Sequence, residues 1–184
     1  MTLQDFFAAH PRCALGFSGG TDSAYLLAAG RELGAEVRPY YVRTAFQPAF
    51  ELRDAERMCE QLNIELTVLD CDILAVPGVA DNPRDRCYFC KRAIFTLIRD
   101  RAAADGFDTL IDGNNASDDA DDRPGMRAVS ELGVLSPLRM CGITKAEVRT
   151  RSTGLGLFTA SKPAYACLAT RIPTGRLITK PELE

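Results

Sequence analysis

The sequence of 184 residues predicts an α/β sandwich with a central parallel sheet. Two observations favour this class. Short apolar runs alternate with segments of helical periodicity along the first two thirds of the chain, which is the order that builds βαβ units. The first apolar run also ends in a double-glycine turn that opens directly into a helix. Hydrophobic residues make up 46% of the chain, which is enough for one core.

The first three elements follow from the pattern near the N-terminus. Residues 14–17 form an apolar strand, and residues 22–33 have the spacing of a helix that stops at Gly34. A second strand is expected over Val37–Val42. Proline has no N–H to donate to a ladder, so Pro39 predicts that this strand is irregular or lies at an edge of the sheet.

Four more elements are expected in the middle of the chain. A helix covers about residues 48–62, and the alternating residues Ile64–Asp70 form a strand. Helical periodicity returns from Cys90 to Ala104, and Thr109–Gly113 is a strand that ends in a loop. The order predicts a Rossmann-like sandwich, in which ligands lie beyond the carboxyl ends of the strands. The crevice is then lined by Ser18–Ser23, the residues that follow Val42, and Asp112–Asn115.

The turn Ser18-Gly19-Gly20-Thr21-Asp22-Ser23 has the composition of a phosphate-binding loop. Glycines let the backbone approach an anion, hydroxyls add donors, and the helix start offers free N–H groups. No Gly-Lys-Ser/Thr follows, and Asp22 stands where it could bind magnesium. The turn resembles the PP-loop of the ATP pyrophosphatases, which implies ATP cleavage between the α- and β-phosphates. The alternative is a glycine-rich turn without a ligand, which rarely needs three hydroxyls and a carboxylate.

The charge balance favours a small substrate. Lys and Arg number 22 against 25 Asp and Glu, which gives a net charge of −3 without a basic block. This weakly disfavours extensive contact with nucleic acid. The N-terminus lacks the regions of a secretory signal and no apolar run reaches membrane-spanning length, so we expect a cytoplasmic protein without membrane contact.

The seven cysteines are best explained by burial, metal binding or catalysis in a reducing compartment. Cys87 and Cys90 form a C-x-x-C pair, which is compatible with a redox dithiol, half a zinc site or an iron–sulfur site. Cys167 completes a set of three thiols that leaves one metal position open. Unrelated thiols remain the alternative. Burial as small apolar residues is expected for Cys13, Cys59, Cys71 and Cys141.

Five motifs in order give a more specific resemblance. They are Ser18–Ser23, Arg86-Cys87-Tyr88-Phe89-Cys90-Lys91, Asp112–Asn115 followed by Asp122-Arg123-Pro124-Gly125, Ser136-Pro137-Leu138, and Pro163–Gly175. Together they are similar to the LarE family, from about residue 12 to the end. That family makes the nickel-pincer nucleotide cofactor of lactate racemase. The resemblance implies that a carboxylate of pyridinium-3,5-dicarboxylate mononucleotide is adenylated, with release of pyrophosphate, and converted to a thiocarboxylate.

Two versions of the family differ in the source of sulfur. One sacrifices the sulfur of a cysteine matched by Cys167, and the other binds a [4Fe–4S] cluster through three cysteines, matched by Cys87, Cys90 and Cys167. Since all three are present, the resemblance implies the cluster type. Its unique iron is then expected to carry an extra sulfide that attacks the acyl-adenylate, so that the protein is a catalyst and not a single-use reagent.

The resemblance also implies roles for other residues. Pyrophosphate is expected at Ser18, Gly19, Gly20, Thr21 and Ser23, magnesium at Asp22, and adenosine at Arg43, Thr44, Gly113 and Asn114. The phosphate and carboxylates of the substrate need fixed cations, for which the candidates are Arg123, Arg171, Arg176 and also Arg127. The groups expected to take part in the chemistry are Cys167, Arg171 and Asp22.

The resemblance has two departures. Thr170 replaces an expected serine but keeps a hydroxyl, and family chains usually continue beyond the equivalent of Pro181. We therefore expect residues 1–160 to form the PP-loop domain and residues 161–184 to begin a C-terminal substrate and sulfur-transfer segment that is truncated here. A homo-oligomer is expected. The alternatives are a tRNA thiolase with a PP-loop and a cluster, and a nucleotide- or metal-binding module without turnover.

Overall fold

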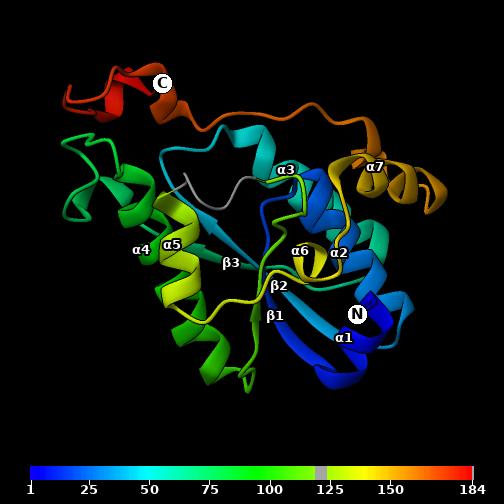
Figure 1. Cartoon of the computed structure of the whole chain (residues 1–184). Helices are drawn as coiled ribbons and strands as arrows, with labels where there is room; N and C mark the ends of the chain where they lie inside the picture. The colour runs from blue at the N-terminus through cyan, green and yellow to red at the C-terminus, as the bar shows by residue number, and fades with distance from the viewer. Residues whose placement is uncertain (119–123, 184) are drawn as a thin grey trace.

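The structure is a computed structural model that describes residues 1–118 and 124–183. Its described residues form a four-stranded parallel sheet in the order β3-β2-β1-β4 (Figure 1). The strands are β1 (Arg12–Gly16), β2 (Glu36–Arg43), β3 (Thr67–Asp70) and β4 (Leu110–Ile111). This arrangement confirms the expected α/β class with a central parallel sheet.

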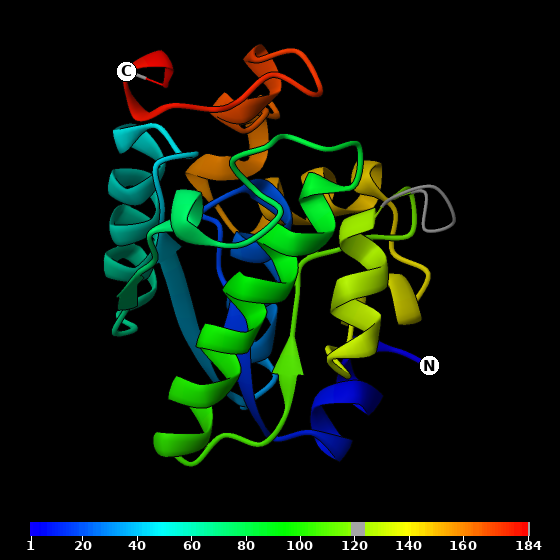
Figure 2. The same ribbon diagram turned by 90° about the vertical axis from the view of Figure 1, so that its left-hand side faces the viewer.

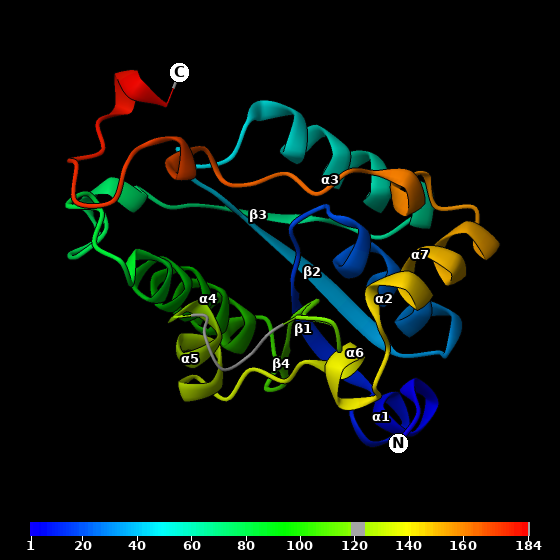
Figure 3. The same cartoon turned by 45° about the horizontal axis from the view of Figure 1, so that its top comes forward.

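Helices cover both faces of the sheet (Figure 3). The α-helices are α1 (Leu3–Ala9), α2 (Thr21–Glu32), α3 (Ala49–Leu62), α4 (Arg86–Ala104), α5 (Pro124–Glu131), α6 (Pro137–Met140) and α7 (Lys145–Gly154). Short 3₁₀ turns are η1 (Ile73–Ala75), η2 (Phe158–Ser161), η3 (Leu168–Arg171) and η4 (Lys180–Glu182). In the described part of the chain, no helix has both the length and the apolar character required to span a bilayer.

Alternation along β1 divides the core between the two faces. Cys13 and Leu15 point to one apolar cluster, which also contains residues of α1, α2, α3 and α7. Ala14 points to the other face and packs with Phe95 and Ile98 of α4. Successive side chains of a strand alternate between the two faces, so one short strand anchors both layers of the sandwich.

Three elements show the clearest differences from the expected boundaries. The strand expected over residues 64–70 begins at Thr67, because Ile64 and Leu66 pack against the core ahead of the ladder. Helix α4 begins at Arg86, four residues before the expected start, which places the C-x-x-C pair on its first turns. The strand expected over residues 109–113 is confined to Leu110–Ile111.

The expectation that Pro39 marks an irregular or edge strand is wrong. Strand β2 lies inside the sheet, between β3 and β1, with Leu15 paired to Pro39. Tyr40 turns its carbonyl toward β1, where it accepts from the Phe17 N–H at 2.9 Å, so the backbone N of Pro39 faces the side of β3. Pairing with β3 begins only at Tyr40, opposite Thr67. The missing N–H of Pro39 therefore removes no hydrogen bond between the strands.

The chain after α7 crosses the end of the sheet toward which the strands point (Figure 2). Its apolar residues form a third cluster with Phe46, Ile73 and Val79. The residues that it contributes are Leu168, Ala169, Ile172, Ile178 and Leu183. The segment that carries Cys167 is thereby packed over the carboxyl ends of the strands.

Candidate functional site

The loop after β1 has the local geometry of an anion cradle. Gly19 has a φ of +70°, and a Cβ added there would lie 3.0 Å from the Ala55 side chain, so both its conformation and its surroundings require glycine. Gly20 is the N-cap of α2 and has no side-chain capping hydrogen bond. The start of α2 therefore keeps N–H groups available for an anion.

The three hydroxyls of the loop face different ways. The Ser18 and Ser23 hydroxyl oxygens lie 3.1 Å apart, and Ser18 Oγ also accepts from the Gly20 N–H at 3.3 Å. The Thr21 hydroxyl donates to the Thr159 carbonyl at 2.9 Å and is buried. The structure therefore brings Ser18 and Ser23 together, while Thr21 anchors the loop to η2.

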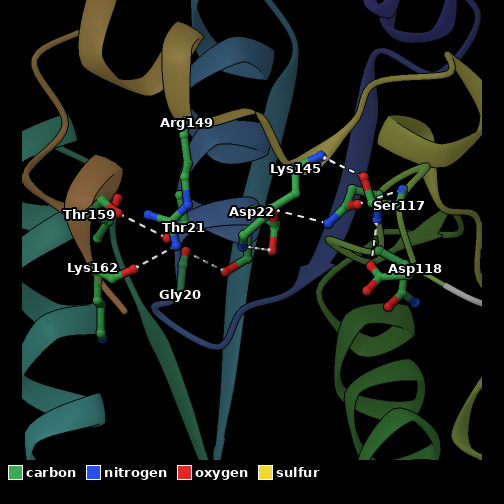
Figure 4. Close-up of polar contacts among 12 residues, drawn as sticks. Gly20, Thr21, Asp22, Ser117, Asp118, Lys145, Arg149, Thr159 and Lys162 are labelled. Carbon is green, nitrogen blue, oxygen red and sulfur yellow. Dashed lines mark hydrogen bonds and ion pairs between the residues drawn. The ribbon is translucent and has the colours of Figure 1, made fainter. Parts of the chain in front are cut away.

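Asp22 is held by two residues from distant parts of the chain (Figure 4). Lys145 Nζ lies 2.6 Å from Asp22 Oδ2, and Asn115 Nδ2 donates to Asp22 Oδ1 at 3.3 Å. The Lys145 N–H donates to the Ser117 hydroxyl at 3.1 Å, which fixes the start of α7 beside the loop after β4. The carboxylate thus lies between a cation and an amide.

A second lysine reaches the loop from the segment after α7. Lys162 Nζ lies 2.6 Å from Asp54 Oδ2 and donates to the Gly19 carbonyl at 3.3 Å, and its side chain is only 14% exposed. Arg149 supports this segment by donating to the Ala160 carbonyl at 2.7 Å and the Lys162 carbonyl at 3.0 Å. Two cations thus flank a loop whose own motif contains no lysine.

Lys145, Lys162 and Asn115 are functional candidates that sequence reasoning did not single out. The usual lysine of a phosphate loop follows the glycines directly, whereas Lys145 lies 123 residues after Asp22. A weak signal existed for Asn115, because it lies in the loop that was expected to enter the crevice.

The loop after β4 approaches α2 closely. A Cβ at Gly113 would lie 2.9 Å from the Ser23 nitrogen, so glycine is needed for this approach. Asn114 donates from its backbone N–H to Asp112 at 3.0 Å and from its side-chain amide to the same carboxylate. Burial raises the pKa of the Asp112 carboxyl, against the effect of hydrogen bonds from Ser136 and Asn114. Asn115, and not Asn114, reaches the phosphate loop.

The residues after β2 are engaged locally. Arg43 forms a two-pronged contact with Asp70 at 2.6 and 2.9 Å, and both side chains are exposed. Thr44 is buried and its hydroxyl donates to Gln47 Oε1 at 2.8 Å. Their expected contact with adenosine stays a prediction.

The three candidate cysteines come from two segments. Cys87 and Cys90 lie on the first turns of α4, and Cys167 is the residue before η3. Burial, together with the charges of Cys87 and Cys167, raises the pKa of Cys90 to about 12, while Arg86 and Lys91 oppose this shift. All seven cysteines are free thiols. Within residues 1–118 and 124–183, no three His, Cys, Asp or Glu side chains are placed so that they could hold a metal ion.

The candidate arginines are exposed and partly engaged. Arg171 donates to the Tyr165 hydroxyl at 2.6 Å, and Arg176 pairs with Glu182. Arg127 lies 4.4 Å from the centre of the Tyr88 ring and 3.8 Å from Glu131. Arg123 lies outside the described residues.

Known proteins resemble this chain over most of its length, although no family model matches it. Uncharacterized protein slr1717 of Synechocystis is 36% identical over 186 residues, covering 99% of this chain and 68% of that protein. Pyridinium-3,5-bisthiocarboxylic acid mononucleotide synthase of Lactiplantibacillus plantarum is 29% identical over 91% of this chain and 62% of its own length. The tRNA-specific 2-thiouridylase MnmA of Salinispora tropica is 29% identical over 83% and 52%.

A solved structure shows the same fold. The NH3-dependent NAD synthetase of Campylobacter jejuni superposes with a TM-score of 0.63 at 21% identity, over 89% of this chain and 74% of that chain. The fold and the loop define a PP-loop protein of the Rossmann-like class. Within that class, the chain belongs to the same family as slr1717 and is similar to the mononucleotide synthase of L. plantarum. It spans about half to two thirds of the length of the curated relatives it matches.

Proposed function

We propose that this chain is the ATP-using part of a sulfurtransferase of nickel-pincer cofactor synthesis. In this proposal it adenylates a carboxylate of pyridinium-3,5-dicarboxylate mononucleotide, releases pyrophosphate and converts the activated carboxylate to a thiocarboxylate. The observation that carries the proposal is the convergence of Asp22, Lys145 and Lys162 on the Gly19-Gly20 turn. The similarity to the mononucleotide synthase of L. plantarum supports this substrate class.

The phosphate loop has the groups that a departing pyrophosphate needs. The N-terminus of α2 supplies N–H donors, Ser18 and Ser23 supply hydroxyls, and the two lysines supply positive charge. Fixed donors and cations stabilise the charge that develops on the leaving group. Adenosine is proposed to contact Arg43, Thr44, Gly113 and Asn114.

Asp22 fits a magnesium ion in the chemistry of its donor atoms. Mg²⁺ commonly binds proteins through one or two carboxylates and takes its other ligands from phosphates and water. The Asp22 carboxylate is partly exposed and already meets a cation, Lys145, at 2.6 Å. A bound Mg²⁺ supplies charge neutralisation between the phosphates. Exchange of Lys145 for the metal would release its ammonium group toward the phosphates.

The three thiols belong to the type of side chain that binds iron–sulfur centres. Cys90 and Cys167 pack against one apolar cluster, Cys87 lies one turn before Cys90 on α4, and the Nε of the neighbouring Arg86 is buried without a partner. We propose that these thiols hold a [4Fe–4S] cluster, which would supply the transferable sulfide. The substrate carboxylates and phosphate are proposed to bind Arg171 and Arg176, together with Arg123 outside the described residues.

Release of pyrophosphate from ATP tests the adenylation step. We expect release to depend on the dicarboxylated pyridinium mononucleotide and to fall on the order of 100-fold in Asp22→Asn. The matched control is Glu32→Gln, which removes an exposed carboxylate at the other end of α2. Release stimulated instead by unmodified tRNA would support the thiolase alternative. Binding of ATP without release under either condition would support a binding module and contradict the proposed activity.

Iron and labile sulfide test the thiol centre separately. Anaerobically reconstituted protein is expected to hold about four of each. The expected result is a lower iron content in Cys87→Ala, Cys90→Ala and Cys167→Ala, with nucleotide binding retained. Cys141→Ala is the control, because Cys141 packs against a different cluster. Equal iron in all four variants would contradict the proposed ligands. A cytoplasmic location and a homo-oligomer stay predictions.

A further inference from the structure

A buried polar bridge joins the C-x-x-C helix to the segment that carries Cys167. Arg86 Nη1 donates to Asn82 Oδ1 and to the Ala169 carbonyl, the latter at 3.2 Å. Asn82 Nδ2 donates to the carbonyls of Ile172 at 3.2 Å and Pro173 at 2.9 Å. These bonds tie residues 169–173 to the residues just before and at the start of α4.

The backbone reinforces the same bridge. The Gly175 N–H donates to the Asn82 carbonyl at 2.8 Å, and the Leu168 N–H donates to the Phe46 carbonyl at 2.9 Å. Asn82 has a φ of +53°, a left-handed conformation that asparagine tolerates better than most residues. The chain that directly follows Cys167 is therefore fixed to the rest of the fold at several points between residues 168 and 175.

Arg86 has an unusual electrostatic position. Its side chain belongs to a residue only 7% exposed, its hydrogen-bond acceptors are neutral, and its Nε has no partner. No carboxylate within the described ranges 1–118 and 124–183 forms an ion pair with it. The nearest ring is that of Phe46, whose centre lies 5.8 Å from the guanidinium carbon. Burial of an unpaired cation is costly, so an anionic group is expected beside it.

A metal centre held by the three cysteines as thiolates would supply that negative charge. Arg86 directly precedes Cys87 and lies one helical turn before Cys90, and its bond to Ala169 reaches within two residues of Cys167. We infer that Arg86 is the positioning residue and counter-charge of the thiol centre. It holds Cys167 against α4 and balances the net negative charge of a group bound by three thiolates. This inference rests on the proposed function.

Four variants separate the two parts of this role. Arg86→Gln removes the charge and the Arg86 bonds to Asn82 and Ala169, and Arg86→Lys keeps the charge. Asn82→Ala removes the three side-chain bonds of Asn82 and keeps the Arg86 bond to the Ala169 carbonyl. Arg99→Gln is the matched control, since Arg99 is an exposed arginine on the same helix. Circular dichroism and thermal unfolding establish that each variant is folded.

The first measurements are the iron content and the reduction potential of the reconstituted protein. We expect several-fold less iron in Arg86→Gln, with partial recovery in Arg86→Lys. Any cluster retained by Arg86→Gln should have a lower reduction potential than wild type, because a nearby positive charge favours the reduced form. Asn82→Ala and Arg99→Gln should keep the wild-type potential. Wild-type iron and potential in Arg86→Gln would overturn the inference.

Alkylation of Cys167 in metal-free protein tests the bridge without a cluster. We expect several-fold faster alkylation in Arg86→Gln and Asn82→Ala than in wild type and Arg99→Gln. If wild type takes up no iron, the proposed cluster fails, and this assay still decides the positioning role. Equal alkylation rates in all the proteins would then overturn the role of Arg86.

Discussion

Lys145 Nζ lies 2.6 Å from the Asp22 carboxylate, so the acid of the phosphate loop is paired with a cation from the start of α7. Both side chains are partly exposed, which leaves them accessible to a metal and to phosphates. In the proposed function, Mg²⁺ and Lys145 therefore compete for the same carboxylate.

Lys145→Met should alter the magnesium requirement of pyrophosphate release. Half-maximal release should need several-fold less Mg²⁺, because no ammonium competes for Asp22. The maximal rate should fall about 10- to 100-fold, because one cation near the leaving group is lost. A magnesium titration measures both effects, with Lys180→Met in the exposed turn η4 as the control. An unchanged magnesium requirement would show that the pair does not compete with the metal.

Thr21→Val and Ser18→Ala should have opposite consequences. The Thr21 hydroxyl donates to the Thr159 carbonyl, so Thr21→Val should lower the free energy of unfolding by about 1 kcal/mol and change ATP affinity little. Ser18 is exposed in the loop, so Ser18→Ala should weaken ATP binding with little loss of stability. Urea unfolding and ATP titration measure the two properties. A larger loss of ATP affinity in Thr21→Val than in Ser18→Ala would contradict the observed orientation of Thr21.

Gly113→Ala should disturb the phosphate loop through steric contact. The new Cβ would lie 2.9 Å from the Ser23 nitrogen, which forces a backbone shift and costs about 1–3 kcal/mol of folding free energy. ATP affinity should fall as well, because Ser23 is displaced. Gly154→Ala is the control, since nothing lies within 4 Å of its added Cβ. Equal stability of the two variants would contradict this packing.

Asp112 should make folding stability depend on pH. Its folded-state pKa is raised above the ordinary value of 3.8, mainly by burial, so folding favours the protonated acid. The favourable contribution is present below the ordinary value and is lost as pH rises through the raised pKa. Asp112→Asn should therefore gain stability relative to wild type over that rise. Urea unfolding at a series of pH values measures the difference, and a gap that stays constant would contradict the prediction.

The sequence predicted those helices and loops whose pattern of residues is contained in one short stretch of the chain. The double glycine after an apolar run located the phosphate loop, and apolar spacing located α2 and α3 nearly to the residue. Pro39 was misinterpreted because its tolerance depends on where β3 begins, a property of sheet pairing and not of the local sequence. The prediction of a strand at residues 64–66 was wrong for a related reason. Alternation of apolar residues alone does not distinguish a hydrogen-bonded strand from a segment that packs against the core.

The candidate site was predictable only in part. The loop and the cysteines carry compact motifs, whereas Lys145 and Lys162 are ordinary lysines until the fold brings them to the loop. Asn115 donates to Asp22, whereas the side chain of Asn114 donates to Asp112, and the sequence predicted neither contact. Which of two neighbouring loop residues makes a given contact depends on hydrogen bonds that the spacing of residues in the sequence does not reveal.

The long sequence separations at the phosphate loop bear on the order of folding. Lys145 meets Asp22 across 123 residues, and Lys162 meets Gly19 across 143. Contacts of such separation form late, because a long chain segment must be closed before they are made. During synthesis, a ribosome-bound chain that ends before α7 has the glycine turn but neither lysine. We therefore expect the chain to bind ATP only once the fold is complete. Bound ATP then stabilises the folded protein by mass action.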